Sequence, residues 1–450
     1  MELAIKIFQF ILSISILVIL HELGHFLPAK YFKTKVEKFY LFFDPYFSLV
    51  KKKIGETEYG IGWLPFGGYV KIAGMVDESM DTEQLKQPAQ PWEFRAKPAW
   101  QRLIIMLGGV TVNFFLAWLI YGCLSFFNGE TSFDTAKVDA PMNYTSVAKG
   151  MGFQDGDKIL KVDGKTQNNF DKLALDVLLS DEITVLRSGK EVTFPTNDDG
   201  KAMAFKDENP RAFLTPRFPA VIDSIYNPKT LQAGLKVGDQ VFAVDGKKIS
   251  YYDEFQETVR NNPGKDLKVD VMRGGAIQPL VLSVSKEGTL GLASYIDKRL
   301  KTYYITKHFT FGESIGRGFT RSIESLTYQV KQFKLIFNKK VQGYKKVGGP
   351  LAIIKNMPVD KAKDGSVSID WTAFWGFTAM FSVWLAFLNL IPIPGLDGGH
   401  VIFTLYEMIV GKPVPQKILE NAQMVGVIFL LGLMLLIFGA DIFKIITNKF

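Results

Sequence analysis

The sequence Leu-His-Glu-Leu-Gly-His-Phe at residues 20–26 places two histidines, His21 and His25, four positions apart, with Glu22 beside the first. On a helix, positions i and i+4 lie on one face, so the two imidazoles converge on one point. Two such nitrogens usually hold a divalent metal, most often zinc, and the intervening glutamate is then placed as a general base. The plainer alternative is a helical turn with two surface histidines. The chain has four histidines in all, so a chance match to this spacing is rare, and we favour a metal site.

An apolar run precedes the two histidines. Between residues 4 and 20 the only charged side chain is Lys6, and the apolar pattern continues past the motif to residue 27. A helix needs about 20 apolar residues to span a bilayer, and ionisable side chains at that depth usually mark a buried functional site. A cleaved signal peptide also fits the length, but no small-x-small cleavage site follows the run. We therefore predict that residues 1–27 form a transmembrane helix with the motif inside the bilayer or at its edge.

Composition narrows the class of protein further. The 450 residues are enough for several domains. The single cysteine, Cys123, excludes an intrachain disulfide and a zinc site built from cysteines. The formal net charge is +8, but the lysines are scattered among acidic residues, so we expect no nucleic-acid partner.

Three further apolar segments predict three more spans. They cover residues 103–127, the first part of 371–400, and 424–443, with a short tail at 444–450. Lysine and arginine gather near the span ends in 28–102, which we therefore place in the cytoplasm together with the connection at 401–423. The long region between the second and third spans is then extracytoplasmic. The predicted fold class is a multi-span α-helical membrane protein with about four transmembrane helices.

The cytoplasmic stretch contains a segment typical of β-structure. Residues 57–72 alternate aromatic or β-branched side chains with glycine, which favours short strands and a membrane-associated β-hairpin. A strand with an open edge can accept an extended peptide through backbone hydrogen bonds, which is one way to hold a protease substrate. The alternative is a hairpin with a structural role only. The candidate substrate-binding residues here are Gly60, Ile61, Gly62, Trp63, Gly67, Gly68 and Tyr69.

The extracytoplasmic region contains an internal repeat. Residues 152–165 return as residues 234–247, and each copy reads as a turn, a strand and a tight Asp-Gly turn. The pattern resembles the PDZ domain of bacterial envelope proteases, which binds a peptide as an added strand. We assign residues 128–218 and 219–290 to two PDZ-like β-rich domains with peptides as candidate ligands. The alternative is two small β domains that only pack together.

Residues 291–370 form the predicted link from the second repeat to the third span. Within it, apolar side chains between residues 312 and 340 step by three or four, which predicts an amphipathic helix. Packing under the second repeat is the commoner arrangement for such a helix, and docking on the outer membrane surface is the alternative.

The histidine pair needs one more ligand, because a catalytic zinc usually takes three protein ligands and a water. Residues 389–400, Asn-Leu-Ile-Pro-Ile-Pro-Gly-Leu-Asp-Gly-Gly-His, break the third span. Irregular backbone at membrane depth is tolerated only where protein or a water-filled cavity surrounds it. The first and third spans run in the same direction, so their C-terminal ends lie at one membrane face, which favours Asp397. His400 is the rival ligand, and Asp441 falls on the opposite face by the same argument.

These motifs together resemble the site-2 protease family of intramembrane zinc metalloproteases, in particular its bacterial branch with two PDZ copies between the second and third spans. The resemblance implies Zn²⁺ bound by His21, His25 and Asp397, with Glu22 as the base. It also implies that Asn389 holds the substrate or stabilises the oxyanion, and that the predicted hairpin binds the substrate as a strand.

Two short motifs bear on the strength of that resemblance. The family's second span usually reads Gly-Pro-x-x-Asn, whereas residues 109–113 read Gly-Val-Thr-Val-Asn, without the proline. Gly-Gly-Pro at residues 348–350, before the third span, fits the family. The match covers essentially the whole chain.

The resemblance implies peptide hydrolysis within the membrane. The substrates expected are single-span proteins of the bacterial inner membrane whose outer domain is already trimmed, such as anti-sigma factors or signal-peptide remnants in regulated intramembrane proteolysis. Glu22 would take a proton from a zinc-activated water and return it to the leaving amine. One alternative is a membrane-anchored PDZ scaffold with a structural metal site, for which His400 is the only evident fourth ligand. A transporter is a further alternative, but the spans show no inverted repeat.

Overall fold

The structure is a computed structural model that describes residues 1–65, 67–75, 87–133, 142–167, 170–206, 213–294, 304–343, 348–362 and 366–447. The chain divides into two compact units. The first unit contains Met1–Gly129, His308–Phe333 and Lys346–Phe450, and the second contains Glu130–Lys307 and Lys334–Lys345.

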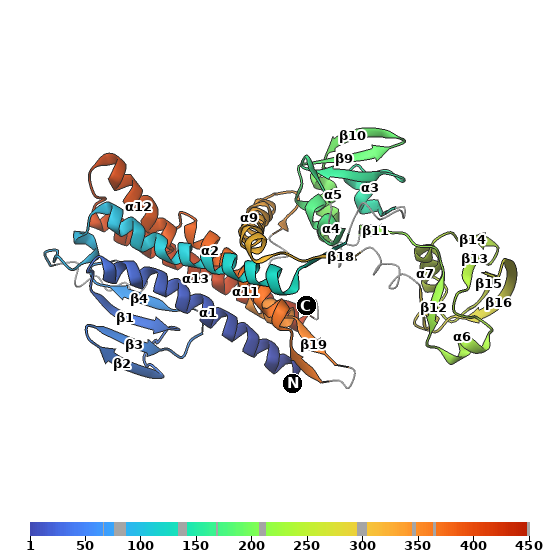
Figure 1. Cartoon of the computed structure of the whole chain (residues 1–450), viewed down its shortest axis with the longest axis horizontal. Helices are drawn as coiled ribbons and strands as arrows, with labels where there is room; N and C mark the ends of the chain where they lie inside the picture. The colour runs from blue at the N-terminus through green and yellow to red at the C-terminus, as the bar shows by residue number, and fades with distance from the viewer. Residues whose placement is uncertain are drawn as a thin grey trace. The chain divides into compact units, whose positions relative to one another are not determined.

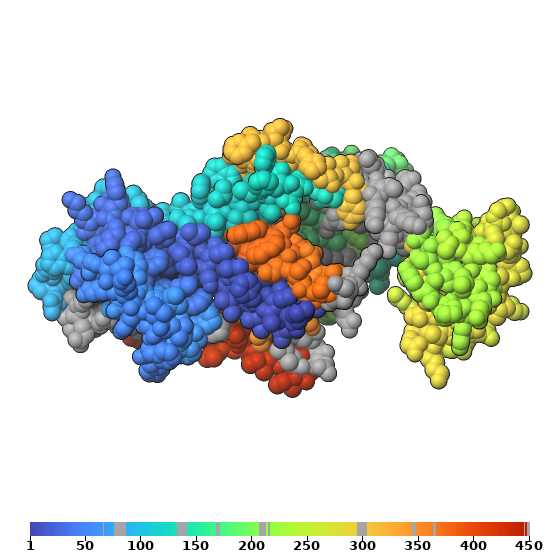
Figure 2. All heavy atoms as spheres, turned by 60° about the horizontal axis from the view of Figure 1, so that its bottom comes forward, coloured from blue at the N-terminus to red at the C-terminus, as the bar shows by residue number. Residues whose placement is uncertain are grey.

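Four helices of the first unit are long and apolar enough to cross a membrane, counting only the described residues. The expectation of four apolar, membrane-length helices is thus confirmed. They are α1 (Glu2–Tyr31), α2 (Ala99–Asn128), α11 (Trp371–Leu390) and α13 (Gln416–Ile446). Helices α1, α2 and α11 lie side by side (Figure 1), and Figure 2 shows α1 in blue against α11 in orange.

Glycines set how closely α1 and α2 approach. A Cβ atom added at Gly24 would overlap the carbonyl of Gly108, and one added at Gly108 would overlap the carbonyl of Gly24. The two backbones therefore touch at this crossing, as small residues allow between membrane helices. Further along α2, Ala117 and Ile120 pack against Val383 of α11 in a buried apolar cluster.

A four-stranded sheet lies beside α1, in the strand order β2-β3-β1-β4 (Figure 1). Strand β1 pairs with β3 in parallel and with β4 antiparallel, so β2 and β4 are the edges. The strands are β1 (Val36–Leu41), β2 (Val50–Ile54), β3 (Thr57–Ile61) and β4 (Tyr69–Ile72).

This sheet corrects the hairpin predicted within residues 57–72. Both expected strands exist, but β1 lies between them, and the hairpin partner of β3 is β2. Gly55 takes a φ of 61° in the short β2–β3 turn, whereas the longer connection from β3 to β4 contains Pro65 and cannot act as a tight two-residue turn. The strand at 36–41 that separates them comes from a distant segment, which local sequence patterns do not indicate.

The rest of the first unit connects these elements. Helix α9, predicted as an amphipathic helix at 312–340, packs against α2, where Trp118 Nε1 donates to the carbonyl of Ile315 at 2.8 Å and Arg321 stacks over Tyr121. The connecting elements are η2 (Phe94–Ala96), α9 (Phe311–Ile336), α10 (Pro350–Lys355), β19 (Val359–Lys361), β20 (Val367–Ile369) and α12 (Asp397–Val410).

The second unit contains the two repeats, each built around a four-stranded sheet. The orders β10-β9-β7-β8 and β14-β13-β15-β16 place corresponding strands in corresponding positions. In both copies the Asp-Gly turn has positive φ, at Asp163 and Gly164 and at Asp245 and Gly246. The main strands are β7 (Lys158–Val162), β8 (Lys165–Thr166), β9 (Glu182–Arg187), β10 (Lys190–Pro195), β13 (Gln240–Val244), β14 (Lys247–Lys248), β15 (Asp266–Arg273) and β16 (Ala276–Ser283).

Each copy closes with short helices and strands over its own apolar core. The helices are α3 (Ser146–Gly150), α4 (Phe170–Leu179), α5 (Asp198–Lys206), α6 (Pro228–Gln232) and α7 (Tyr252–Arg260). The strands pair as β5 (Glu130–Phe133) with β18 (Tyr304–Lys307), β6 (Met142–Tyr144) with β11 (Leu214–Pro216), and β12 (Ile222–Ile225) with β17 (Leu292–Ser294).

Candidate metal centre

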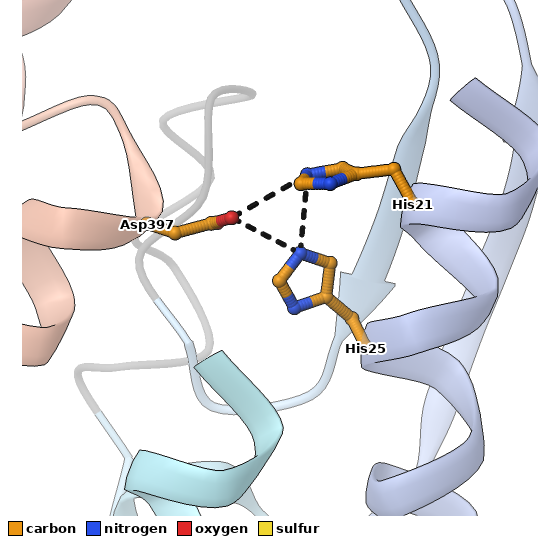
Figure 3. A group of neighbouring side chains, drawn as sticks. All are labelled: His21, His25 and Asp397. Atoms are coloured by element: carbon orange, nitrogen blue, oxygen red, sulfur yellow. Dashed lines mark hydrogen bonds and ion pairs between the residues drawn. The ribbon is translucent and has the colours of Figure 1, made fainter. Parts of the chain in front are cut away.

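Three side chains from helices α1 and α12 converge on one point. His21 and His25 lie one turn apart on α1, and Asp397 is the first residue of α12 (Figure 3). The Nε2 atoms of the two histidines are 3.3 Å apart. Oδ2 of Asp397 lies 3.4 Å from Nε2 of His21 and 3.3 Å from Nε2 of His25. The structure thus brings together the three ligands predicted from sequence.

The charges and lone pairs of this group fit a bound cation. Nδ1 of His25 lies 2.8 Å from the carbonyl oxygen of Ile105, which can only accept, so Nδ1 carries the proton. A neutral ring then turns the lone pair of Nε2 toward the carboxylate of Asp397. Among the described residues, the buried Oδ2 of Asp397 has no donor besides the two ring nitrogens. A cation between these atoms removes the repulsion, and two imidazoles with one carboxylate are a usual zinc set.

Three protein ligands leave a coordination position open. In the described part of the chain, the group contains His21, His25 and Asp397 and no fourth histidine, cysteine or acid. His400 lies three residues into α12 and lines the same cavity without joining the group. Structural zinc sites are usually closed by four protein ligands, whereas catalytic sites keep one position for water. If the three residues bind zinc, their number is the one typical of a catalytic site.

Asp397 owes its position to a break between α11 and α12. Helix α11 ends at Leu390, two prolines follow, and Gly395 takes a φ of 101°. Gln423 of α13 accepts a hydrogen bond from the Gly395 N–H at 3.2 Å. A Cβ atom at Gly426 would overlap the carbonyl of Pro394, so α13 packs directly on the loop. Gln423 and Gly426 support the turn that carries Asp397, and no sequence pattern predicts this.

A cavity of about 680 Å³ adjoins the three ligands and is bounded on one side by β4. Glu22 and Val70 of β4 both line it. The edge strand of the sheet therefore borders the same cavity as the residue predicted to act as the base.

The predicted substrate-binding residues separate into two groups. Gly67, Gly68 and Tyr69, at the start of β4, line the cavity. The others lie in β3 and the loop after it, outside the cavity lining. A Cβ at Gly60 would overlap the ring of Tyr40, whereas Ile61 and Trp63 are exposed. That second group is Gly60, Ile61, Gly62 and Trp63.

The hydroxyl of Tyr69 fixes the cavity end of β4. Burial, and then the nearby carboxylate of Asp44, raise the pKa of Tyr69, so its hydroxyl remains protonated. It donates a hydrogen bond to Oδ1 of Asp44 at 2.8 Å, and its ring stacks on that of Tyr40. The side chain that follows the Gly67-Gly68 turn is thus held in place by Asp44, which lines the same cavity, and by the ring of Tyr40.

Two asparagines contact His21. Nδ2 of Asn389, near the end of α11, lies 3.2 Å from Nε2 of His21. Nδ2 of Asn113, on α2, lies 3.1 Å from Nδ1 of the same ring. Asn389 was predicted as a site residue. Asn113 was not among the predicted site residues, and no local sequence pattern identifies His21 as its partner.

Asp441 has a different role from the three ligands. It is buried in α13 and accepts hydrogen bonds from the backbone N–H groups of Gly349 at 2.9 Å and Leu351 at 3.1 Å. The carboxylate thereby satisfies donors at the start of α10. It is absent from the metal-ligand group, in line with the span-parity argument.

Comparison with known proteins gives consistent matches along the chain. A family model described as peptidase family M50 matches residues 9–433. The regulator of sigma-E protease RseP from Escherichia coli is 29% identical over 448 residues, covering 95% of this chain and 96% of RseP. Proteins named as zinc metalloproteases are similar over comparable lengths: one from Vibrio cholerae at 27% identity over 451 residues (94% of this chain, 95% of that protein) and one from Neisseria meningitidis at 28% over 458 residues (98% of each).

Proposed function

Since the chain belongs to peptidase family M50, we propose that it cleaves peptide bonds within the transmembrane segments of single-span membrane proteins. Membership makes the chain a site-2-type metalloprotease that depends on zinc. The observation that carries the proposal is the convergence of His21, His25 and Asp397 beside membrane-length helices.

We assign the zinc ligands to His21, His25 and Asp397, with Glu22 as the general base. Zinc, when bound, supplies Lewis acidity and lowers the pKa of water at the open position. Glu22 takes the proton of the attacking water and gives it to the leaving amine. The side-chain amide of Asn389 donates to the oxygen of the scissile carbonyl, a role supported by its place beside His21.

The substrate binds as an extended strand along β4. A helical segment hides its carbonyl groups in its own hydrogen bonds, so it must unwind before hydrolysis. The outer edge of β4 supplies replacement backbone partners, and its position along the cavity next to Glu22 supports this role. Gly67, Gly68 and Tyr69 are the residues of the predicted set that we retain as substrate contacts.

The two repeats act on the extracytoplasmic side as PDZ-like domains, in a protein of the bacterial inner membrane. Their matching strand order and Asp-Gly turns support one fold in both copies. They bind peptide ends or exclude substrates whose outer domain is intact. A relative whose name is regulator of sigma-E protease RseP supports trimmed anti-sigma factors as the substrate class, and signal-peptide remnants share the same single-span form.

The proposed function is tested with the full-length chain in membranes and a tagged single-span substrate. Glu22→Gln keeps the shape of the side chain and leaves all three ligands in place, so zinc content should stay at the wild-type level. Cleavage should fall by at least about a thousandfold, because proton transfer is lost. Cleavage by Glu22→Gln at the wild-type rate would disprove the assignment of Glu22 as the base.

A further inference from the structure

Helix α2 presents one narrow face to the metal centre. Ile105, Gly109 and Asn113 are spaced by four residues and so lie on the same side of the helix. All three are buried. A Cβ atom added at Gly109 would overlap the rings of both His21 and His25, so the middle position of this face leaves room for the imidazoles.

Ile105, the first residue of that face of α2, contacts His25. Nδ1 of His25 donates to the carbonyl oxygen of Ile105 at 2.8 Å. This contact fixes the proton on Nδ1 and leaves Nε2 to face Asp397. Metal-binding histidines usually have such a partner on the second ring nitrogen, which fixes the ring's tautomer and orientation.

Asn113, the last residue of that face of α2, contacts His21. The side-chain amide of Asn113 lies 3.1 Å from Nδ1 of His21, while Nε2 points toward Asp397. Asn113 is fully buried, and its Oδ1 has no hydrogen-bond partner among the described residues. Its own backbone carbonyl accepts from Ser382 of α11 at 2.7 Å, so the residue is fixed between helices.

A ring that binds metal through Nε2 while neutral must carry its proton on Nδ1, and that proton needs an acceptor. The two ends of a side-chain amide have nearly the same shape, so a half-turn about the terminal torsion brings Oδ1 to Nδ1 in the same space. The buried Oδ1 then gains the donor that it otherwise lacks. Asn113 and Ile105 would serve the two histidines in equivalent ways.

We infer that Asn113 is a positioning residue of the metal centre, which accepts the Nδ1 proton of His21 and thereby commits Nε2 to zinc. The inference deepens the proposed function and rests on its ligand assignment. It also gives the asparagine of the 109–113 segment a role that does not require the missing proline.

The test compares two variants of similar shape in the purified full-length protein. Asn113→Asp keeps an acceptor oxygen, whereas Asn113→Leu has none. Zinc affinity is measured by competition with a chelator, independently of proteolysis. We expect Asn113→Leu to weaken zinc binding by about 10–100-fold, as loss of such a partner typically does, and Asn113→Asp to stay within about threefold of wild type. Thr111→Leu, on the exposed side of α2, is the matched control and should bind zinc normally.

Asp397→Ala, measured in parallel, separates two kinds of failure. If Asp397→Ala loses zinc while Asn113→Leu keeps wild-type affinity, the role of Asn113 is wrong and the ligand assignment stands. Equal losses in Asn113→Leu and Asn113→Asp also overturn the inference, because they indicate a packing role. If Asp397→Ala retains zinc, the ligand assignment itself fails, and the role of Asn113 fails with it.

Discussion

Two aspartates, one in each compact unit, are placed in opposite ways. Asp239, in the second repeat, is 1% exposed and accepts hydrogen bonds from Nε of Arg273 at 2.6 Å and from the backbone N–H of Lys236 at 2.8 Å. Asp397 faces two imidazole nitrogens across 3.3–3.4 Å, with no other donor to its buried Oδ2 among the described residues. Asp239 finds its hydrogen-bond donors within the protein. Asp397 lacks a donor to Oδ2 other than the two imidazoles, among the described residues.

The first repeat shows that the Asp239 arrangement is structural. Asp157 accepts from Nε of Arg187 at 2.8 Å and from the backbone N–H of Gln154 at 2.8 Å. In both copies the arginine also donates to the carbonyl of a glycine before the strand, Gly152 or Gly234. The same network in two copies stabilises the same turn. A buried carboxylate without such a network is costly unless it binds a cation or a proton, and for Asp397 the two imidazoles beside it favour a cation.

Within the comparison of the two aspartates, the largest expected effect comes from removing the carboxylate of Asp397. Asp397→Ala should lose zinc on dialysis, and cleavage of a tagged single-span substrate should fall by more than about a hundredfold, because loss of a ligand costs more than loss of a supporting partner. Zinc content of the purified protein is the direct measurement. His400→Ala is the control and should retain zinc, because His400 lies outside the ligand group. Zinc loss from His400→Ala alone would exchange the two assignments.

The next effect concerns the strand edge beside the site. Val70→Pro removes a backbone N–H of β4 at the cavity that Glu22 also lines, and we expect cleavage to fall by about 10–100-fold while zinc content is unchanged. Val70→Ala shortens the same side chain and keeps the N–H, so it should cleave at a rate near that of wild type. If cleavage falls equally in both variants, the Val70 side chain matters through its packing, and the proposal that the substrate pairs with β4 is not supported.

Sequence predicted the parts of this centre that depend on local spacing. The His21–His25 pair follows from helical periodicity, and Asp397 follows from the direction in which successive spans cross. The hairpin prediction was wrong because the strand between β3 and β4 comes from residues 36–41, and strand neighbours are set by long-range packing. The supporting roles of Gln423 and Asn113 could not be predicted from the sequence either, because they depend on which faces of α13 and α2 pack against the site.

A smaller effect is expected when the carboxylate of Asp239 loses its partner, Arg273. Arg273→Met leaves Asp239 buried without its main donor and should destabilise the second repeat. Zinc content should not change, because the ligands belong to the other unit. Hydrogen exchange of β15 in the full-length chain measures the loss of stability. Arg187→Met should act in the same way on β9, and protection unchanged in both strands would contradict the structural role of the pair.

The smallest effect is a dependence of the second repeat on pH. Burial favours the neutral form of Asp239, but the hydrogen bonds and charge of Arg273 and the N–H of Lys236 outweigh it and hold the pKa of Asp239 below its usual range. A carboxyl group with a lowered pKa in the folded state stabilises the fold above its unfolded pKa, about 3.9, and this contribution is lost as the pH falls through the folded pKa. The protection factors of the β15 amides, which correct for the intrinsic pH dependence of hydrogen exchange, should therefore fall below about pH 4. Asp239→Asn should be less stable at neutral pH and show a weaker acid response, because it cannot lose a charge that it does not carry.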